Sequence, residues 1–179
     1  MHLMTCAAAL PEFRMFAAEH DNHASAPPEP DYWRNYRPKF FGSDDFEALS
    51  AFTEILIPTD ETPGAREAHC AHFIDFVLHA AEGYAPETQQ RWRAALKQLR
   101  DIGFHASDGP GRATIVETIS LPERDRSKKH PVFAAYRLIK QETVFAFYTS
   151  RAGMIGALDY RGNTYNVSFP ACTHPDHHV

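Results

Sequence analysis

Apolar residues in the middle of the chain recur at helical spacing. Phe46, Leu49, Phe52 and Leu56 follow one another at intervals of three or four residues, which places them on one side of a helix. Four further segments show the same periodicity, and proline or glycine separates them. The pattern predicts a mainly α fold, a compact single-domain bundle of about five helices over residues 43–149. The expected helices lie near residues 43–57, 63–81, 86–102, 113–121 and 131–149.

Several helix boundaries are marked by the residues that usually occupy them. Asp44 and Glu47 have the spacing of a capping box at the start of the first helix. Thr62 is a suitable N-cap for the second helix, and Pro63 suits a first helical position because proline has no N–H to leave unpaired. These signals predict that the second helix begins at about Pro63.

The segment 131–149 is apolar on nearly all sides, with residues such as Phe133, Ile139 and Phe147. A helix of this kind is usually central and covered from several directions. Its C-terminal half is rich in β-branched and aromatic residues, so a strand is an alternative there. The segment Asp108–Gly111 is expected to be a loop that precedes a short helix.

The two ends of the chain lack the helical pattern. Residues 1–42 are interpreted as an export-signal remnant followed by an extended aromatic arm. A short apolar run indicates the signal, with an ordinary flexible or short helical arm as the alternative, and four prolines between residues 27 and 38 disfavour a helix in the aromatic arm. Residues 150–179 are predicted to be an irregular tail that packs on the domain or on a partner.

Several aromatic residues of these two ends are expected to be buried against another surface. That surface belongs either to a partner chain or to the domain itself. The expected partner-interface residues are Tyr32, Trp33, Tyr36, Tyr160, Tyr165 and Phe169.

Composition excludes several classes of protein. The net charge is −5, and acidic residues interrupt the one basic run, near residues 124–129, so no dedicated nucleic-acid surface is expected. No apolar run reaches the roughly 20 residues that span a bilayer, so no direct membrane span is expected. The three cysteines are widely spaced and form no metal-binding pair. Cys70 is expected in the core, and a disulfide between Cys70 and Cys172 remains an alternative to free thiols.

The sequence lacks the motifs of a self-sufficient redox enzyme. The segment Gly109–Thr114 lacks the third glycine of a dinucleotide-binding loop and carries a proline inside it. No C-x-x-C-H string attaches a c-type haem, and no G-x-S-x-G string marks a serine nucleophile. We therefore expect no catalytic residue and no cofactor-binding residue in this chain.

The second predicted helix carries three histidines, a residue type that often binds metal ions. His69, His72 and His79 lie on one side of it, with Asp75 nearby. His72 and His79 are about 10 Å apart along a helix axis, too far to share one ion. A polar helix face with surface His–Asp contacts is therefore favoured over a metal site.

The tail holds a second group of metal-ligating residues. Cys172, His174 and His177 could bind zinc, copper or haem iron, because thiolate and imidazole suit all three. Contact with a partner chain and a solvated tail without a special role are the alternatives. A metal- or haem-binding protein that uses Cys172 and His174 is thus the alternative function.

Residues 49–75 carry a resemblance to a known family. They contain Ile-Pro-Thr-Asp-Glu-Thr-Pro-Gly-Ala from Ile57 to Ala65, and then Phe-Ile-Asp at 73–75. This helix, turn and helix resemble the gluconate 2-dehydrogenase subunit 3 family. Residues 158–163 and 169–175 are also similar to that family, so the resemblance covers about residues 46–178.

The resemblance implies a partner chain. In that family the small subunit accompanies a large FAD-dependent flavoprotein of the glucose-methanol-choline type, often with a multi-haem cytochrome c. It therefore implies a non-catalytic small subunit in the periplasm, with FAD in the partner and haem c in a third subunit where one is present. Family precursors often carry twin-arginine signals, which implies export together with the flavoprotein. Related complexes oxidise gluconate or the 3-hydroxyl of glucosides.

Overall fold

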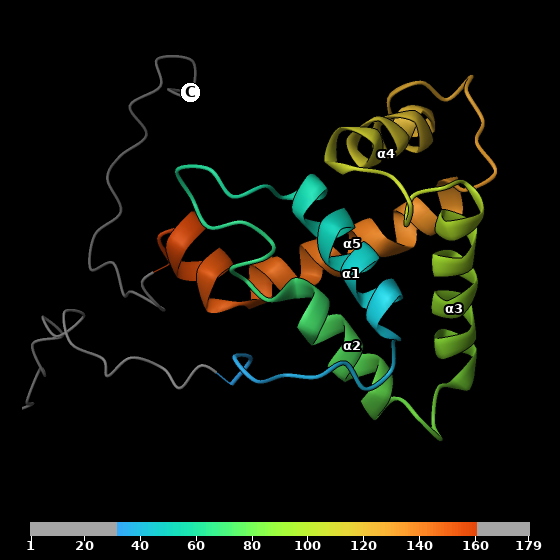
Figure 1. Cartoon of the computed structure of the whole chain (residues 1–179). Coiled ribbons are helices and arrows are strands. Elements are labelled where there is room, and N and C mark those ends of the chain that lie inside the picture. The colour runs from blue at the N-terminus through green and yellow to red at the C-terminus, as the bar shows by residue number, and fades with distance from the viewer. Residues whose placement is uncertain (1–31, 161–179) are drawn as a thin grey trace, which may run out of the picture. The chain divides into compact units, whose positions relative to one another are not determined.

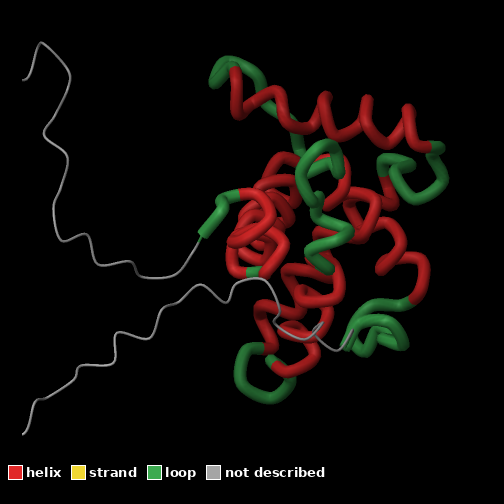
Figure 2. Tube along the Cα trace, turned by 90° about the vertical axis from the view of Figure 1, so that its left-hand side faces the viewer, coloured by secondary structure: helices red, strands yellow, loops and turns green. Residues whose placement is uncertain are grey.

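The computed structural model describes residues 32–160, and all regular structure in this part is helical. Figure 2 shows helices joined by loops, with no strand among the described residues. The predicted mainly α bundle of about five helices is therefore confirmed. The elements are α1 (Ser43–Leu56), α2 (Cys70–Ala80), α3 (Pro86–Asp101), α4 (Gly109–Arg124), α5 (Phe133–Thr149) and a π-helix, η1 (Ala152–Ala157).

Helix α5 is the central element of the bundle. It crosses the domain and contacts each of the other four α-helices and η1 (Figure 1). Ile139, Thr143 and Phe147 follow one another every four residues on its buried side. The Thr143 hydroxyl donates to the carbonyl of Ile139 one turn earlier, which satisfies it inside the core. The alternative of a strand in the second half of this segment is wrong.

The main core lies between α5 and the helices around it. It joins Phe52 of α1, Trp92 of α3 and Phe104 of the α3–α4 connection, and each of these side chains is almost fully buried. The Phe52 ring centroid lies 5.3 Å from that of Phe104 and 6.4 Å from that of Tyr136 of α5, and the Trp92 ring packs against Phe41 at 5.9 Å. Burial of such large rings supplies most of the hydrophobic stabilisation of a small domain.

The second helix begins later than predicted, at Cys70. Thr62 is no N-cap, because its amide and hydroxyl both donate to Asp60 in a local turn. The Glu54 carboxylate accepts from the amides of Thr59 and Arg66 and so holds the α1–α2 connection closed. These local hydrogen bonds outweigh the helix-start signal at Pro63.

The starts of α1 and α4 also differ from prediction. The capping box at Asp44 and Glu47 is wrong: Gly42 occupies the N-cap without a side-chain hydrogen bond, and Glu47 lies 3.4 Å from the Arg112 guanidinium. Helix α4 takes in most of the predicted loop, because the Asp108 carboxylate accepts from the Gly111 amide at its N-terminus. The helix therefore runs from Gly109 to Arg124 instead of from 113 to 121.

The chain remains ordered in helical form after α5. Residues 150–179 were predicted to be irregular, but Ala152–Ala157 form the π-helix η1. Gly153 is required at its start, because a Cβ there would overlap the carbonyl oxygen of Phe147. The predicted C-terminal tail beyond Tyr160 lies outside the described residues, as does the predicted export-signal remnant.

Candidate functional site

Four hydrogen bonds from the N-terminal arm converge on Asp75 of α2. One carboxylate oxygen accepts from the Tyr36 hydroxyl at 2.6 Å and the Lys39 amide at 2.7 Å. The other accepts from the amides of Phe40 at 3.1 Å and Phe41 at 2.8 Å. The side chain is completely buried, so α2 fixes the arm from residue 36 onward.

The prediction of surface contacts between Asp75 and the neighbouring histidines is therefore wrong. The Asp75 carboxylate is buried, and it accepts hydrogen bonds from backbone amides of the N-terminal arm. The sequence held a signal for this role, because Asp75 is the one acidic residue inside the apolar run Phe73–Leu78. An acid in such a run is buried only where donors surround it.

The surroundings of Tyr36 favour the protonated side chain, so its hydroxyl remains a hydrogen-bond donor. Burial raises the pKa of Tyr36 above its ordinary value, and the hydrogen bond to Asp75 and the negative charge of Asp75 raise it further. Because the folded pKa lies above the unfolded one, this contribution to stability is complete below about pH 10 and declines only at higher pH. The Tyr36 hydroxyl therefore remains a donor to Asp75 across the neutral pH range.

A cluster of rings surrounds this link. The His72 ring centroid lies 5.7 Å from Trp33, 5.4 Å from Tyr36 and 5.0 Å from Phe46. His69 lies 5.1 Å from His72 and presents a buried Nδ1 without a hydrogen-bond partner. These ring contacts pack the arm against α1 and α2, next to the hydrogen bonds that Asp75 accepts.

The histidines are not assembled as a metal centre in the described part of the chain. No group of three or more His, Cys, Asp or Glu residues with suitable placement occurs between residues 32 and 160. His79 lies in the last turn of α2, and Asp75 is occupied by the arm. The tail candidates Cys172, His174 and His177 lie outside the described residues.

Cys70 is a free cysteine in the core, where its Sγ lies 3.9 Å from the carbonyl oxygen of Thr143. Burial raises the pKa of this thiol to about 12. Because the thiolate is the reactive form, the native protein is expected to keep Cys70 unmodified by iodoacetamide at pH 8 for hours. Peptide mapping by mass spectrometry would measure this, with the urea-unfolded protein as the control in which Cys70 reacts within minutes. Equal labelling in both states would contradict the buried position.

The predicted partner-interface residues differ in their surroundings. Tyr32 and Tyr160 are exposed, Trp33 is half-buried, and Tyr36 is engaged inside the domain by Asp75. For Tyr36, packing within the domain, the alternative named from sequence, is the observed arrangement. Tyr165 and Phe169 lie outside the described residues.

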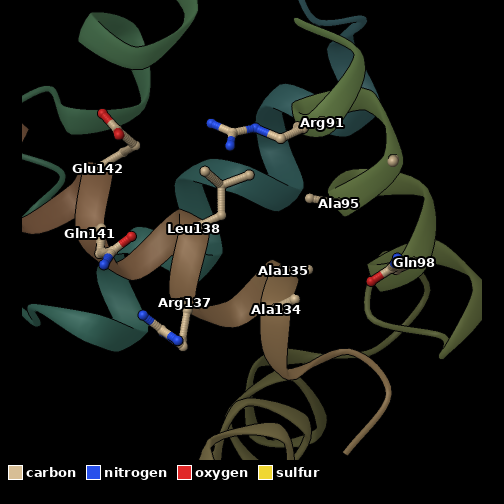
Figure 3. Close-up of a pocket in the computed structure, with 10 residues that line it drawn as sticks. Arg91, Ala95, Gln98, Ala134, Ala135, Arg137, Leu138, Gln141 and Glu142 are labelled. Atoms are coloured by element: carbon tan, nitrogen blue, oxygen red, sulfur yellow. The ribbon is translucent and has the colours of Figure 1, made fainter. Parts of the chain in front are cut away.

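An open groove of about 460 Å³ lies between α3 and α5, and sequence reasoning missed it. Alanines form much of its lining, including the buried Ala95 and Ala135, so the two helices leave room above them. Figure 3 shows Arg91 reaching from α3 toward the side of α5 that carries Leu138. The remaining lining residues are Ala94 and Gln98 of α3 and Ala134, Arg137, Gln141 and Glu142 of α5.

These features define a small helical domain with a fixed N-terminal arm and an open groove. The sequence matches the family described as gluconate 2-dehydrogenase subunit 3 over residues 43–165, which is more than half of the chain. The chain therefore belongs to the gluconate 2-dehydrogenase subunit 3 family, as the resemblance in residues 49–75 predicts. No curated protein and no solved structure shows significant similarity to it.

The described helices also bear on membrane association. Within residues 32–160, none combines the length and apolar character that crossing a bilayer requires.

Proposed function

We propose that this chain is the non-catalytic small subunit of a periplasmic, FAD-dependent sugar or sugar-acid dehydrogenase. Its partner is a large flavoprotein of the glucose-methanol-choline type, which carries the FAD and oxidises gluconate or the 3-hydroxyl of a glucoside. A c-type cytochrome subunit completes the complex where one is present. The small subunit stabilises the flavoprotein and accompanies it during export.

The family match over residues 43–165 is the observation that carries this proposal. The family is named as a subunit of a dehydrogenase, so its members act beside other chains. The architecture suits such a role. A rigid core built on α5 supports an arm fixed by Asp75 and aromatic side chains that remain exposed, and aromatic residues are enriched at interfaces.

Co-production with the host's flavoprotein subunit would test the proposal. With this chain present, we expect a stable complex on size-exclusion chromatography that shows flavin absorbance and oxidises gluconate or a glucoside. Without it, the soluble, exported yield of the flavoprotein should fall by roughly tenfold, because binding stabilises the folded partner by mass action. The purified small subunit alone should be colourless and inactive.

A specific result would contradict the proposal. A flavoprotein that is exported, stable and fully active in the absence of this chain needs no such subunit. Turnover or flavin absorbance by the isolated small subunit would also contradict the assigned division of roles.

A further inference from the structure

One side of α5 is left open although the helix is apolar nearly all round. The buried side holds Ile139, Thr143 and Phe147, whereas Phe145 and Tyr148 on the other side are 56% and 46% exposed. Leu138, Gln141, Phe145 and Tyr148 follow one another at intervals of three or four residues, so they form one continuous stripe. The helix is central to the bundle, but the described residues leave Gln141, Phe145 and Tyr148 exposed and cover Leu138 only in part.

Helix α2 extends the same surface. Its Phe73 ring centroid lies 6.2 Å from that of Phe145, which joins the two helices side by side. Phe76 and Val77 stand next to Phe73 on α2 and are 46% and 39% exposed. We call this surface the α2–α5 face. It consists of Phe73, Phe76 and Val77 of α2 and Leu138, Phe145 and Tyr148 of α5.

Other exposed apolar side chains are of two kinds. Ile155, Leu158 and Tyr160 lie in or just after η1, which packs on α5, and the others are isolated. Tyr84 lies in the α2–α3 connection and Leu121 in α4, and scattered residues of this kind are normal. A contiguous aromatic surface is uncommon on a monomer and marks a binding site. We therefore expect another molecule to bind the α2–α5 face.

Charge at the edge of the face indicates the chemistry of that occupant. Leu138 lines both the face and the α3–α5 groove, which carries Arg91 and Arg137. Arg91 and Arg137 form no ion pair within 4.0 Å among residues 32–160, although the chain as a whole is acidic. Arg137 has a longer-range attraction to Glu123, so Arg91 is the less compensated of the two. Glu142 is the one acidic residue in the groove lining, so the groove keeps a net positive charge. Carboxylates opposite the two arginines would complement it.

We propose that the flavoprotein subunit docks on the α2–α5 face. It covers the aromatic centre with apolar side chains and places carboxylates opposite Arg91 and Arg137. This inference rests on the proposed function, which supplies the partner. The apolar centre accounts for affinity, and the arginines account for orientation and salt dependence.

Binding between the full chain and the purified flavoprotein subunit would test the proposal. Phe145→Glu should weaken binding by at least about tenfold, because it places a charge in the apolar centre. Tyr84→Glu is the matched control, since Tyr84 is 73% exposed and lies off the face, and it should bind like the wild type. Arg91→Glu should weaken binding at low salt and reduce its dependence on ionic strength. Thermal unfolding of each variant alone would show that the fold is intact.

The outcomes separate the two proposals. If the wild-type chain binds and Phe145→Glu and Arg91→Glu bind equally well, the docking surface is wrong and the proposed function stands. If the wild-type chain does not bind the flavoprotein, the proposed function itself fails. If Phe145→Glu abolishes self-association of the wild-type chain but leaves flavoprotein binding unchanged, the face joins two copies of this chain and the inference is overturned.

Discussion

Replacing Asp75 with alanine is expected to lower the free energy of unfolding by about 3–5 kcal/mol. The substitution removes the acceptor for the Tyr36 hydroxyl and for three successive backbone amides, Lys39 to Phe41. The Phe41 amide is buried, so its hydrogen-bonding capacity cannot pass easily to water. Loss of these bonds should also free the arm from α2.

Two measurements would check this expectation. Urea unfolding followed by circular dichroism gives the change in free energy. Trypsin cleavage after Lys39, whose side chain is exposed, reports release of the arm and should become several times faster.

Asp101→Ala provides the matched control for an acidic residue on the surface. Among the residues that the structure describes, Asp101 pairs only with the exposed Lys97 one turn away, so its loss should cost less than about 0.5 kcal/mol. Asp75→Asn should fall between the two, because the amide keeps one acceptor oxygen and turns an NH₂ toward backbone donors. If Asp75→Ala changed stability no more than Asp101→Ala and left Lys39 protected, the arm would not depend on this carboxylate.

The helices that the sequence predicted well are those defined by side-chain periodicity. Trp92 and Leu99 mark one side of the segment that starts at Pro86, and the structure places α3 there, ending within a residue of the predicted end. Helix α5 likewise ends at Thr149 as predicted. Its apolar character on all sides correctly indicated a central position. The uncovered stripe at Phe145 did not follow from sequence, because composition does not say which chain supplies the cover.

The features that sequence missed depend on contacts between distant segments. Asp75 was assigned to a surface with His72 because both lie on α2, but its partners come from residues 36–41. The start of α2 was placed at Pro63 from local preference, and the acceptor that decides it is Glu54, in the preceding helix. In each case a carboxylate pairs with backbone amides of another segment, and such pairing has no periodic signature.

Replacing Gly64 with alanine is the second substitution expected to have a large effect, with a loss of about 2–4 kcal/mol. A Cβ at this position would overlap the Thr59 amide nitrogen and would lie 2.7 Å from the carbonyl carbon of Pro58. These are backbone atoms, so the α1–α2 connection has to open to admit the methyl group. Opening would disturb both amides that Glu54 holds, at Thr59 and Arg66.

The same change should also affect η1, through its contact with Pro63. A Cβ on Gly156 of η1 would lie 2.7 Å from the Pro63 ring, so the connection and η1 are in close contact. In Gly64→Ala, amide hydrogen exchange should therefore rise in residues 152–157 as well as in residues 58–66. Gly109→Ala is the control, because the added Cβ meets no atom of another described segment within 4 Å. Pro110 follows this position and disfavours a helical alanine there, so we expect a loss of no more than about 1 kcal/mol. If both variants unfolded at the same urea concentration, the close packing of Gly64 would not be what holds α1, α2 and η1 together.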